Sequence, residues 1–367
     1  MHFVSQRDQL LKALQMVMGA VERKHTMAIL ANVHLEVFSH QLLLTATDLD
    51  IELTASVILA EPADTGTTTV SARKLLDIVR NLPAGAMVDF LVQDKKIVIR
   101  CGKSRFSLAS LSAEEYPRIE NKPNEHEFVM QPAPLLQVVQ AVQFSIAQDD
   151  VRQTLNGLLL DFNVGHLKAV ATDGHRLAVS ECGQQNVEWT GQIILPRKAS
   201  QELVRLLSDV ENPITISLRS NLIKVATEQV TLVAKLIEGH YPNYHKVIPE
   251  DCQNEVVIGR DFLKEVLSRV AVLLTEKYKG VRLRFREHAL TIIATNPQQD
   301  MAEETIELNY PGEDIDMGFN VHYLLDALAA ISVNDVRLGF NQGDNSGLVI
   351  QACEDEASLY VVMPMRL

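Results

Sequence analysis

The sequence predicts an α+β protein built from three copies of one domain, and three observations support this fold class. A short string recurs at nearly constant spacing: Thr45–Asp48, Val170–Asp173 and Ile293–Asn296 begin 125 and then 123 residues apart. Each copy contains two segments in which apolar residues recur with helical spacing. The segments between them alternate with the period of β-strands, which favours antiparallel sheets with the helices segregated on one side.

Two helices are expected in each copy. In the first helix of the chain, Leu10, Leu14 and Val17 fall on one face of a helix of about 3.6 residues per turn, and Leu75 and Val79 do so in the second. By the same pattern the helices are expected at Gln6–Val17, Arg73–Leu82, Pro132–Phe144, Arg197–Leu207, Arg260–Leu273 and Val321–Ile331.

An alternating, strand-like segment lies just upstream of the recurring string in every copy. These segments are Val33–Val37, Leu158–Phe162 and Val281–Phe285, and the first copy adds Leu42–Thr47, Ile97–Arg100 and Phe106–Leu111. Along each copy the order is strand, helix, several strands, then helix and several strands again. Each copy is therefore expected to contain two βαβββ units, with paired helices on one side of antiparallel sheets.

Polar, proline-bearing stretches are expected to separate the copies. They lie at Glu120–Glu125 and Pro249–Asn254. The predicted domains are therefore residues 1–124, 125–251 and 252–367. The 367 residues, 47% of them hydrophobic, are enough for two or three cores.

Composition restricts the partners and the compartment. The net charge of −13 argues against non-specific binding of nucleic acid or membrane by the whole surface. The four cysteines are at least 70 residues apart, which disfavours a zinc or redox site and is typical of a reducing compartment. The charged N-terminal segment is unlike a signal peptide, and no apolar run reaches the roughly 18 residues of a membrane span. A cytoplasmic protein is expected.

Positive charge is concentrated in the predicted helices. These six segments hold eleven Lys and Arg against six Asp and Glu, a net charge of +5, so the rest of the chain carries −18. Arg73 and Arg80 lie opposite the apolar face of one helix, and Lys198 and Arg205 opposite that of another. One such helix is ordinarily a solvated face, whereas several in an acidic chain favour a surface that contacts phosphates without reading base sequence.

Catalytic signatures are scarce. The sequence has no phosphate-binding loop, dinucleotide-binding glycine motif, zinc-protease motif or nucleophile elbow. Asp48 and Asp50 lie on one side of a strand region without a third metal ligand, so no metal site and no cofactor are expected. The string Thr172–Leu177 contains Asp173, His175 and Arg176, which would suit a hydrolase, but a hairpin turn that presents side chains to a partner is favoured.

Two further segments indicate binding surfaces. Asp300–Asp316 holds seven acidic residues and no Lys or Arg, which suits either a solvated face or half of an electrostatic subunit contact. The C-terminal segment Leu359–Leu367 is unusually apolar for a chain end and carries Met363-Pro364-Met365. Methionines at a surface favour an adaptable binding edge.

The threefold repeat, the string Ala171–Ala178 and the terminal Tyr360–Leu367 together resemble the bacterial β sliding clamp family, the processivity subunits of DNA polymerase III. The resemblance covers the chain from Phe3 to Leu367. It implies three clamp-type domains per chain and a head-to-tail homodimer that closes into a ring, with helices lining the hole. It also implies no catalytic activity and no cofactor. The implied partners are duplex DNA bound independently of sequence, the replicative polymerase catalytic subunit, the clamp loader and other proteins with a clamp-binding motif.

The resemblance also implies three sets of site residues. The duplex-facing set is Lys24, Arg73, Arg80, Gln148, Asp149, Gln153, Thr154, Arg197, Lys198 and Lys279. The set that binds partner peptides is Leu155, Thr172, Gly174, His175, Arg176, Leu177, Pro242, Lys246, Val247, Tyr278, Asn320, Tyr323, Gly347, Val361, Val362, Met363, Pro364, Met365 and Arg366. The subunit contact joins Lys74, Ile78, Leu82, Lys103, Arg105, Phe106 and Leu108 to Val272, Leu273, Glu303 and Glu304.

Overall fold

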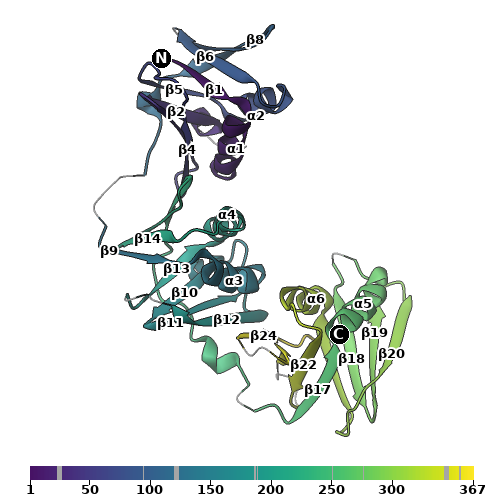
Figure 1. Cartoon of the computed structure of the whole chain (residues 1–367). Helices are drawn as coiled ribbons and strands as arrows, with labels where there is room; N and C mark the ends of the chain where they lie inside the picture. The colour runs from purple at the N-terminus through teal and green to yellow at the C-terminus, as the bar shows by residue number, and fades with distance from the viewer. Residues whose placement is uncertain are drawn as a thin grey trace. The chain divides into compact units, whose positions relative to one another are not determined.

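The computed structural model describes residues 1–22, 27–93, 95–119, 124–185, 187, 189–249, 251–275, 277–342, 347–354 and 357–367 (Figure 1). Their contacts divide the chain into two compact units. One comprises Met1–Ala133 with Gln201–Leu236, and the other Pro134–Ser200 with Ile237–Leu367. The second repeat therefore contributes to both units.

The helices of the described segments follow the predicted pattern. They are α1 Arg7–Val17, α2 Ala72–Asn81, α3 Pro132–Val142, α4 Arg197–Leu207, α5 Arg260–Val270 and α6 Val321–Ala330. The expected extension of α3 to Phe144 and of α5 to Leu273 is wrong, because the chain tightens there into 3₁₀ turns. These turns are η4 (Gln143–Ser145) and η7 (Ala271–Leu273), and η1 (Met18–Ala20) follows α1 in the same way.

Within the described residues, each repeat supplies eight strands. In the first repeat they are β1 His2–Gln6, β2 Asn32–Phe38, β3 Gln41–Thr47, β4 Ile51–Ile58, β5 Gly66–Ser71, β6 Met87–Gln93, β7 Lys96–Cys101 and β8 Ser104–Leu111. In the second they are β9 His126–Met130, β10 Gly157–Asn163, β11 Gly165–Thr172, β12 Arg176–Gln185, β13 Gly191–Pro196, β14 Ile214–Arg219, β15 Leu222–Ala226 and β16 Val230–Lys235. In the third they are β17 Asn254–Gly259, β18 Gly280–Arg286, β19 Ala289–Thr295, β20 Met301–Glu307, β21 Ile315–Asn320, β22 Asp335–Phe340, β23 Leu348–Ala352 and β24 Ser358–Val362.

The strand order repeats as the sequence does. Each repeat has two antiparallel runs of four strands: β1-β6-β7-β8 with β5-β2-β3-β4, β9-β14-β15-β16 with β13-β10-β11-β12, and β17-β22-β23-β24 with β21-β18-β19-β20. Neighbouring repeats are joined edge to edge. β4 pairs with β16, where Leu53 lies opposite Leu232, and β12 pairs with β24, where Ala178 lies opposite Tyr360.

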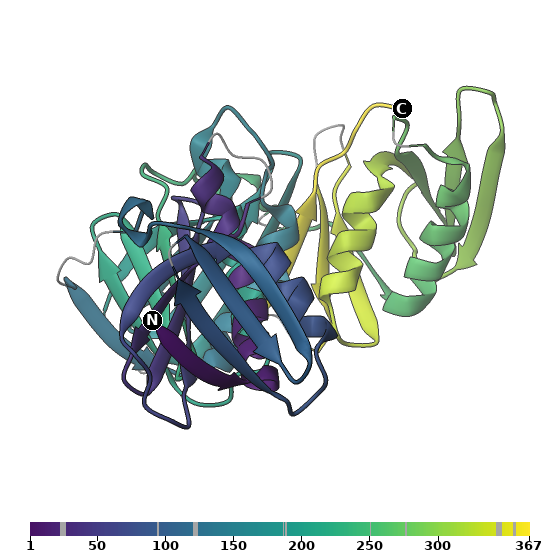
Figure 2. The same ribbon diagram turned by 90° about the horizontal axis from the view of Figure 1, so that it is seen from above.

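The helices pair on the sheets that they cover. α1 contacts α2 and the strands β3 and β4. α5 contacts α6 and β19, and Figure 2 shows these two helices side by side. The apolar helix faces read from the sequence are buried: Leu10, Leu14 and Val17 on α1, and Leu75 and Val79 on α2. Burial of these faces against sheet side chains is the main stabilising contribution to such layers.

One buried residue carries a pH-sensitive contribution to stability. His34 on β2 is 6% exposed, and its Nδ1 has no hydrogen-bond partner among the described residues. Its ring lies 5.3 Å from that of Tyr116. Burial, reinforced by the nearby positive charge of Arg118, lowers the pKa of His34 from 6.5 to about 4.

Stability of the first unit should therefore fall as the pH drops from 6.5 to 4, because the unfolded chain binds a proton that the folded chain resists. Above pH 6.5 this contribution is fully present. The expected loss is about 2 kcal/mol by pH 4. The free energy of unfolding in urea, measured by hydrogen exchange of peptides from β2, should decrease from pH 6.5 to pH 4 in the wild type. This decrease should be lost in His34→Leu. The exposed His40 is the matched control, and a slope unchanged in His34→Leu would contradict the assignment.

Candidate functional site

The recurring string forms one kind of turn at the end of the first hairpin in each of the first two repeats. In the second repeat, the Thr172 hydroxyl donates to the Arg176 carbonyl at 2.6 Å and accepts from the Gly174 N–H at 3.1 Å. Thr47 makes both contacts at the equivalent positions of the first repeat. Gly174 has a φ of +86°, a left-handed conformation that favours glycine. The predicted hairpin turn is thus confirmed.

The acidic residue of the string holds the turn together. One oxygen of Asp173 accepts from the N–H groups of His175 and Arg176, at 2.9 and 3.0 Å. Asp48 likewise accepts from the N–H of Asp50 at 2.9 Å. The prediction that Asp48 and Asp50 lie on one side of a strand is wrong: both are in the turn, with Asp48 buried and Asp50 exposed. Side-chain capping of free N–H groups is the reason for an acid here.

Arg176 makes more side-chain contacts to other elements than any other residue described for this turn. Its side chain is only 12% exposed, and it forms ion pairs with Asp173 at 3.1 Å and with Asp326 of α6 at 2.5 Å. The guanidinium also donates to the main-chain carbonyl of Phe144 at 2.7 Å and lies 4.4 Å from the ring centroid of Tyr323. Arg176 thereby connects the hairpin to α6 and to the end of α3, so its first role is to position the turn.

Two tyrosines surround the turn. The hydroxyl of Tyr241 accepts from the N–H of Thr172 at 3.1 Å, and burial raises the pKa of that phenol well above its ordinary value. The ring of Tyr323 stacks on His175 with centroids 6.5 Å apart. Burial, and next the charge of Asp173, raises the pKa of Tyr323. Both phenols therefore stay neutral hydrogen-bonding groups at physiological pH.

The C-terminal segment runs along the turn and is held by its backbone. After β24, the N–H of Met363 donates to the His175 carbonyl and that of Met365 to the Gly318 carbonyl, both at 2.8 Å. A side chain at Gly347 would collide with Val361, so only glycine fits beneath the segment. The segment leaves Met363 half-buried and Met365 exposed.

An apolar cluster forms the floor beneath the turn and the C-terminal segment. Its buried members are Leu159, Val170, Leu177, Ile194, Val349 and Val361. Half-buried side chains complete it: Val179, Ile237, Tyr241, Tyr244, Ile248, Cys252, Leu359 and Met363. The combination of an aliphatic floor, methionines and a few oriented polar groups suits an extended peptide with apolar side chains.

The remaining residues of the peptide-binding set fall in the same unit. Leu155 and Val362 are buried, and Asn320 caps α6 by accepting from the His322 N–H. Pro242, Lys246 and Val247 are exposed on and beside η6 (Tyr244–Val247). Tyr278 and Arg366 are exposed, and Pro364 is half-buried.

Sequence reasoning missed three residues that build this site: Phe144, Tyr241 and Asp326. A signal existed for Tyr241, because the Tyr-Pro pair at 241–242 also occurs at Tyr116 in the first repeat. The Tyr116 hydroxyl also bonds to main chain near the first turn, but as a donor, to the Thr45 carbonyl at 3.3 Å. For Phe144 and Asp326 the contacts depend on segments far apart in sequence.

The turn does not have the arrangement of a hydrolytic centre. Both oxygens of Asp173 are engaged, one by backbone N–H groups and the other by the Arg176 guanidinium. The ring of His175 is stacked on that of Tyr323. Within the described segments, no group of three His, Cys, Asp or Glu side chains is arranged to hold a metal ion.

The duplex-facing set is spread over both units. Arg73 and Arg80 are exposed on α2, and Gln148, Asp149 and Gln153 are exposed in the loop that follows α3. Thr154, Arg197, Lys198 and Lys279 are half-buried, and Lys24 lies outside the described residues. The Arg197 guanidinium donates to the Ile146 carbonyl at 2.6 Å.

Several arginines counted in the positive charge of the helical segments hold helix ends, among them Arg205 of the predicted outward set, which donates to the Gln15 and Met16 carbonyls. Arg7 donates to the carbonyls of Val79 and Arg80 at the end of α2, at 2.9 and 2.6 Å. Arg260 donates to the carbonyl of Ile331 just after α6. Cations are favourable at the negative, C-terminal end of a helix. The expectation that the outward helix faces are basic is therefore only partly correct.

The subunit-contact set lies in the first and third repeats, and most of its side chains are exposed or half-buried. On α2, Lys74 is exposed, Ile78 half-buried and Leu82, just past the helix, buried. On and beside β8, Lys103 and Arg105 are exposed, and Phe106 and Leu108 half-buried. In the third repeat, Val272 is 79% exposed, Leu273 half-buried and Glu303 exposed, while Glu304 pairs with Arg269 at 2.6 Å.

None of the helices in the described segments has the length and apolar character needed to span a membrane.

Comparison with known protein families matches almost the whole chain. Residues 1–120 match the N-terminal domain of the DNA polymerase III beta subunit, 130–243 its central domain and 245–366 its C-terminal domain. The chain is 44% identical to the beta sliding clamp of Pseudomonas putida over 368 aligned positions, covering 100% of both chains.

Solved structures give the same result. The crystal structure of the DNA polymerase III subunit beta from Pseudomonas aeruginosa superposes with a TM-score of 0.94 at 41% identity, covering 100% of both chains. A sliding clamp from the same organism bound to griselimycin superposes with a TM-score of 0.94 at 42% identity, again covering 100% of both chains. These matches agree with the threefold α+β architecture described above.

Proposed function

The chain belongs to the DNA polymerase III beta subunit family, the bacterial β sliding clamps, and from this we propose that two copies close head to tail into a ring around duplex DNA. The ring tethers the replicative polymerase and has no catalytic activity of its own. Three clamp domains, at residues 1–124, 125–251 and 252–367, and a cytoplasmic location are part of this proposal.

The observation that carries the proposal is the pattern of strand edges. Within the chain, the fourth strand of one repeat pairs with the last strand of the next, as β4 does with β16 and β12 with β24. The fourth strand of the third repeat is β20, and the last strand of the first repeat is β8. In the described residues, β20 pairs only with β19, and β8 pairs with β7 and, through its last two residues, with β5. A second copy would satisfy both edges.

The repeat also gives the register of that joint. Leu53, Ala178 and Ala302 hold equivalent places on the fourth strands, each opposite the alanine of the recurring string. Leu232, Tyr360 and Phe106 hold equivalent places on the last strands, and the first two lie opposite Leu53 and Ala178. Phe106 should therefore lie opposite Ala302 of a second copy, both being half-buried.

One residue along, the exposed Arg105 should lie opposite the exposed Glu303. The acidic run of the third repeat thus meets a basic strand of the first, and cross-strand pairs of opposite charge stabilise antiparallel strands.

Duplex DNA would contact the helices through cations such as Arg73 and Lys198. A ring needs no tight grip, because closure around the duplex prevents dissociation while weak phosphate contacts allow sliding. The acidic remainder of the chain would repel other DNA.

Partner proteins would dock a short extended peptide on the apolar floor beside the turn and the C-terminal segment. The set named from the resemblance provides the walls, with Met363 and Met365 as adaptable contacts and the exposed His175 as a polar neighbour. The ligands would be the polymerase catalytic subunit, the clamp loader and other proteins with a clamp-binding motif.

The test is topological. After loading by a clamp loader, the protein should remain on nicked circular DNA during gel filtration and be lost when the DNA is linearised, because a ring slides off free ends. Substitution of Arg73 and Lys198 by Glu should reduce loading and make its salt dependence shallower, because fewer phosphate contacts release counterions. Equal retention on circular and linear DNA would contradict encirclement.

A further inference from the structure

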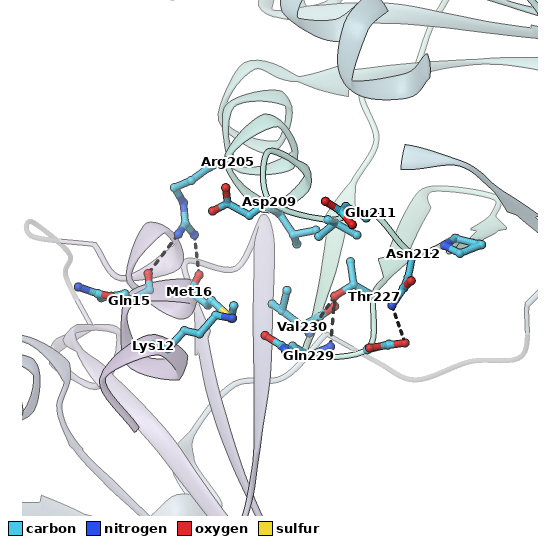
Figure 3. A pocket seen from close by; sticks show the side chains of 14 residues that line it. Lys12, Gln15, Met16, Arg205, Asp209, Glu211, Asn212, Thr227, Gln229 and Val230 are labelled. Carbon is cyan, nitrogen blue, oxygen red and sulfur yellow. Dashed lines mark hydrogen bonds between the residues drawn. The ribbon is translucent and has the colours of Figure 1, made fainter. Parts of the chain in front are cut away.

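A charged contact recurs at the two joints between repeats. At the first joint, Arg205 of α4 donates to the carbonyls of Gln15 and Met16 at the end of α1, at 3.1 and 2.5 Å (Figure 3). The same guanidinium pairs with Glu202, one helical turn earlier, at 2.5 Å. An arginine thus bridges an acid on one repeat and the negative end of a helix on its neighbour.

At the second joint an acid, an arginine and a carbonyl that follows a first helix also come together, but the arginine belongs to the hairpin instead of the helix. Asp326 is the sixth residue of α6, as Glu202 is of α4. Its arginine is Arg176, which donates to the carbonyl of Phe144 in η4, directly after α3. The ninth position of α6, where α4 has Arg205, is Ala329. The bridge is therefore kept although its arginine has moved to the hairpin.

The first repeat has an acid and an arginine at the same helix positions as Glu202 and Arg205, but in the described structure no helix end of another repeat is bonded to them. Asp77 and Arg80 are the sixth and ninth residues of α2. Their charged atoms are 4.0 Å apart, and their side chains are 59% and 56% exposed. Among the first helices of the three repeats, α1 is followed by carbonyls that accept from Arg205 and α3 by a carbonyl that accepts from Arg176. In the described structure the end of α5 has no such arginine, and Val272 of η7 beside it is 79% exposed.

Side-chain size at the joint supports the match. The second residue of the 3₁₀ turn lies over the acid: a Cβ added at Gly19 would overlap the Glu202 carboxylate. The equivalent residue in the third repeat is Val272, and the acid that would face it is Asp77, one methylene shorter than glutamate. At the proposed joint, valine replaces the glycine of the 3₁₀ turn, and aspartate replaces the glutamate that faces it.

We propose that Arg80 is a subunit-joint residue: across the ring joint it donates to the main-chain carbonyls of Ser268 and Arg269 of the partner subunit, with Asp77 orienting the guanidinium. These carbonyls occupy the positions of Gln15 and Met16, the ninth and tenth residues of the first helix. This inference rests on the proposed head-to-tail dimer and moves Arg80 from the duplex-facing set to the subunit joint.

The dimer dissociation constant tests it, measured by sedimentation from nanomolar to micromolar concentration. Arg80→Ala should raise the constant about a hundredfold, roughly tenfold for each of the two joints broken. Arg80→Lys should fall between, because a single ammonium cannot bridge acid and carbonyls as a planar fork does. Arg73→Ala, on the same helix, should weaken DNA binding and leave the constant unchanged.

A size exchange separates this geometry from a general charge effect. Asp77→Glu should weaken the dimer by crowding Val272, and Asp77→Glu with Val272→Gly should restore it, because the pair then reproduces Glu202 over Gly19. A dimeric wild type whose dissociation constant does not change in Arg80→Ala would overturn the inference and leave the ring intact. A wild type that is monomeric at micromolar concentration would overturn both.

Discussion

Arg105→Glu should convert the ring into monomers. The substitution places glutamate opposite Glu303 in the β8–β20 register given by the repeat, and like charges directly opposite in antiparallel strands are destabilising. Juxtaposed like charges at an interface reduce affinity by several kcal/mol, and the ring contains two such joints. The dimer dissociation constant should therefore rise at least about a thousandfold. Sedimentation at micromolar concentration would show the monomer mass.

The reciprocal exchange identifies the pair. Arg105→Glu combined with Glu303→Arg should recover most of the dimer, because the charges are opposite again. Arg100→Glu is the matched control: Arg100 is exposed on β7, one strand inside the edge, and should leave the dimer unaffected. Failure of the double exchange to recover any dimer, with both proteins folded, would contradict the register.

Deletion of Met363–Leu367 should abolish partner-peptide binding and leave dimerisation unchanged. The deletion removes the hydrogen bonds of the Met363 and Met365 N–H groups to the hairpin and β21, together with the methionine wall of the proposed groove. Peptide affinity should fall at least about a hundredfold, the range of losing a few well-packed anchors. Calorimetry with a polymerase-derived clamp-binding peptide measures it, and sedimentation of the same protein measures the dimer.

A shorter deletion distinguishes the wall from the chain end. Removing only Arg366 and Leu367 keeps both main-chain hydrogen bonds and should retain most of the affinity. If the longer deletion bound peptide as the wild type does, the groove would not lie here. If it dissociated the dimer, the groove and the subunit joint would not be separate.

Much of the fold could be predicted because its signals are local. The helical spacing of Leu10, Leu14 and Val17 depends only on neighbours in sequence, and burial in the structure follows it. The turn at Thr172–Leu177 was also predictable, because short-range capping by Thr172 and Asp173 determines it. The errors are at helix ends, where 3₁₀ turns replace the last helical residues.

The candidate site was predictable only through resemblance to a family, since the residue types alone fitted a hydrolase as well. Arg176 shows why. From sequence it is one cation in a tempting triad, whereas in the structure it pairs with Asp326, 150 residues away, and caps the turn after α3. Such roles depend on contacts between repeats, which no local pattern encodes.

By itself the sequence determined the number of repeats, the alternation of strands and helices and the separation of basic helices from an acidic remainder. These follow from periodicity and composition, which act over a few residues at a time. Only the tertiary structure decided which cations are available to a ligand. Arg7, Arg205 and Arg260 are held at helix ends, whereas Arg73 stays exposed. A charge acquires its role from the groups that folding brings within hydrogen-bonding distance, and those groups lie far along the chain.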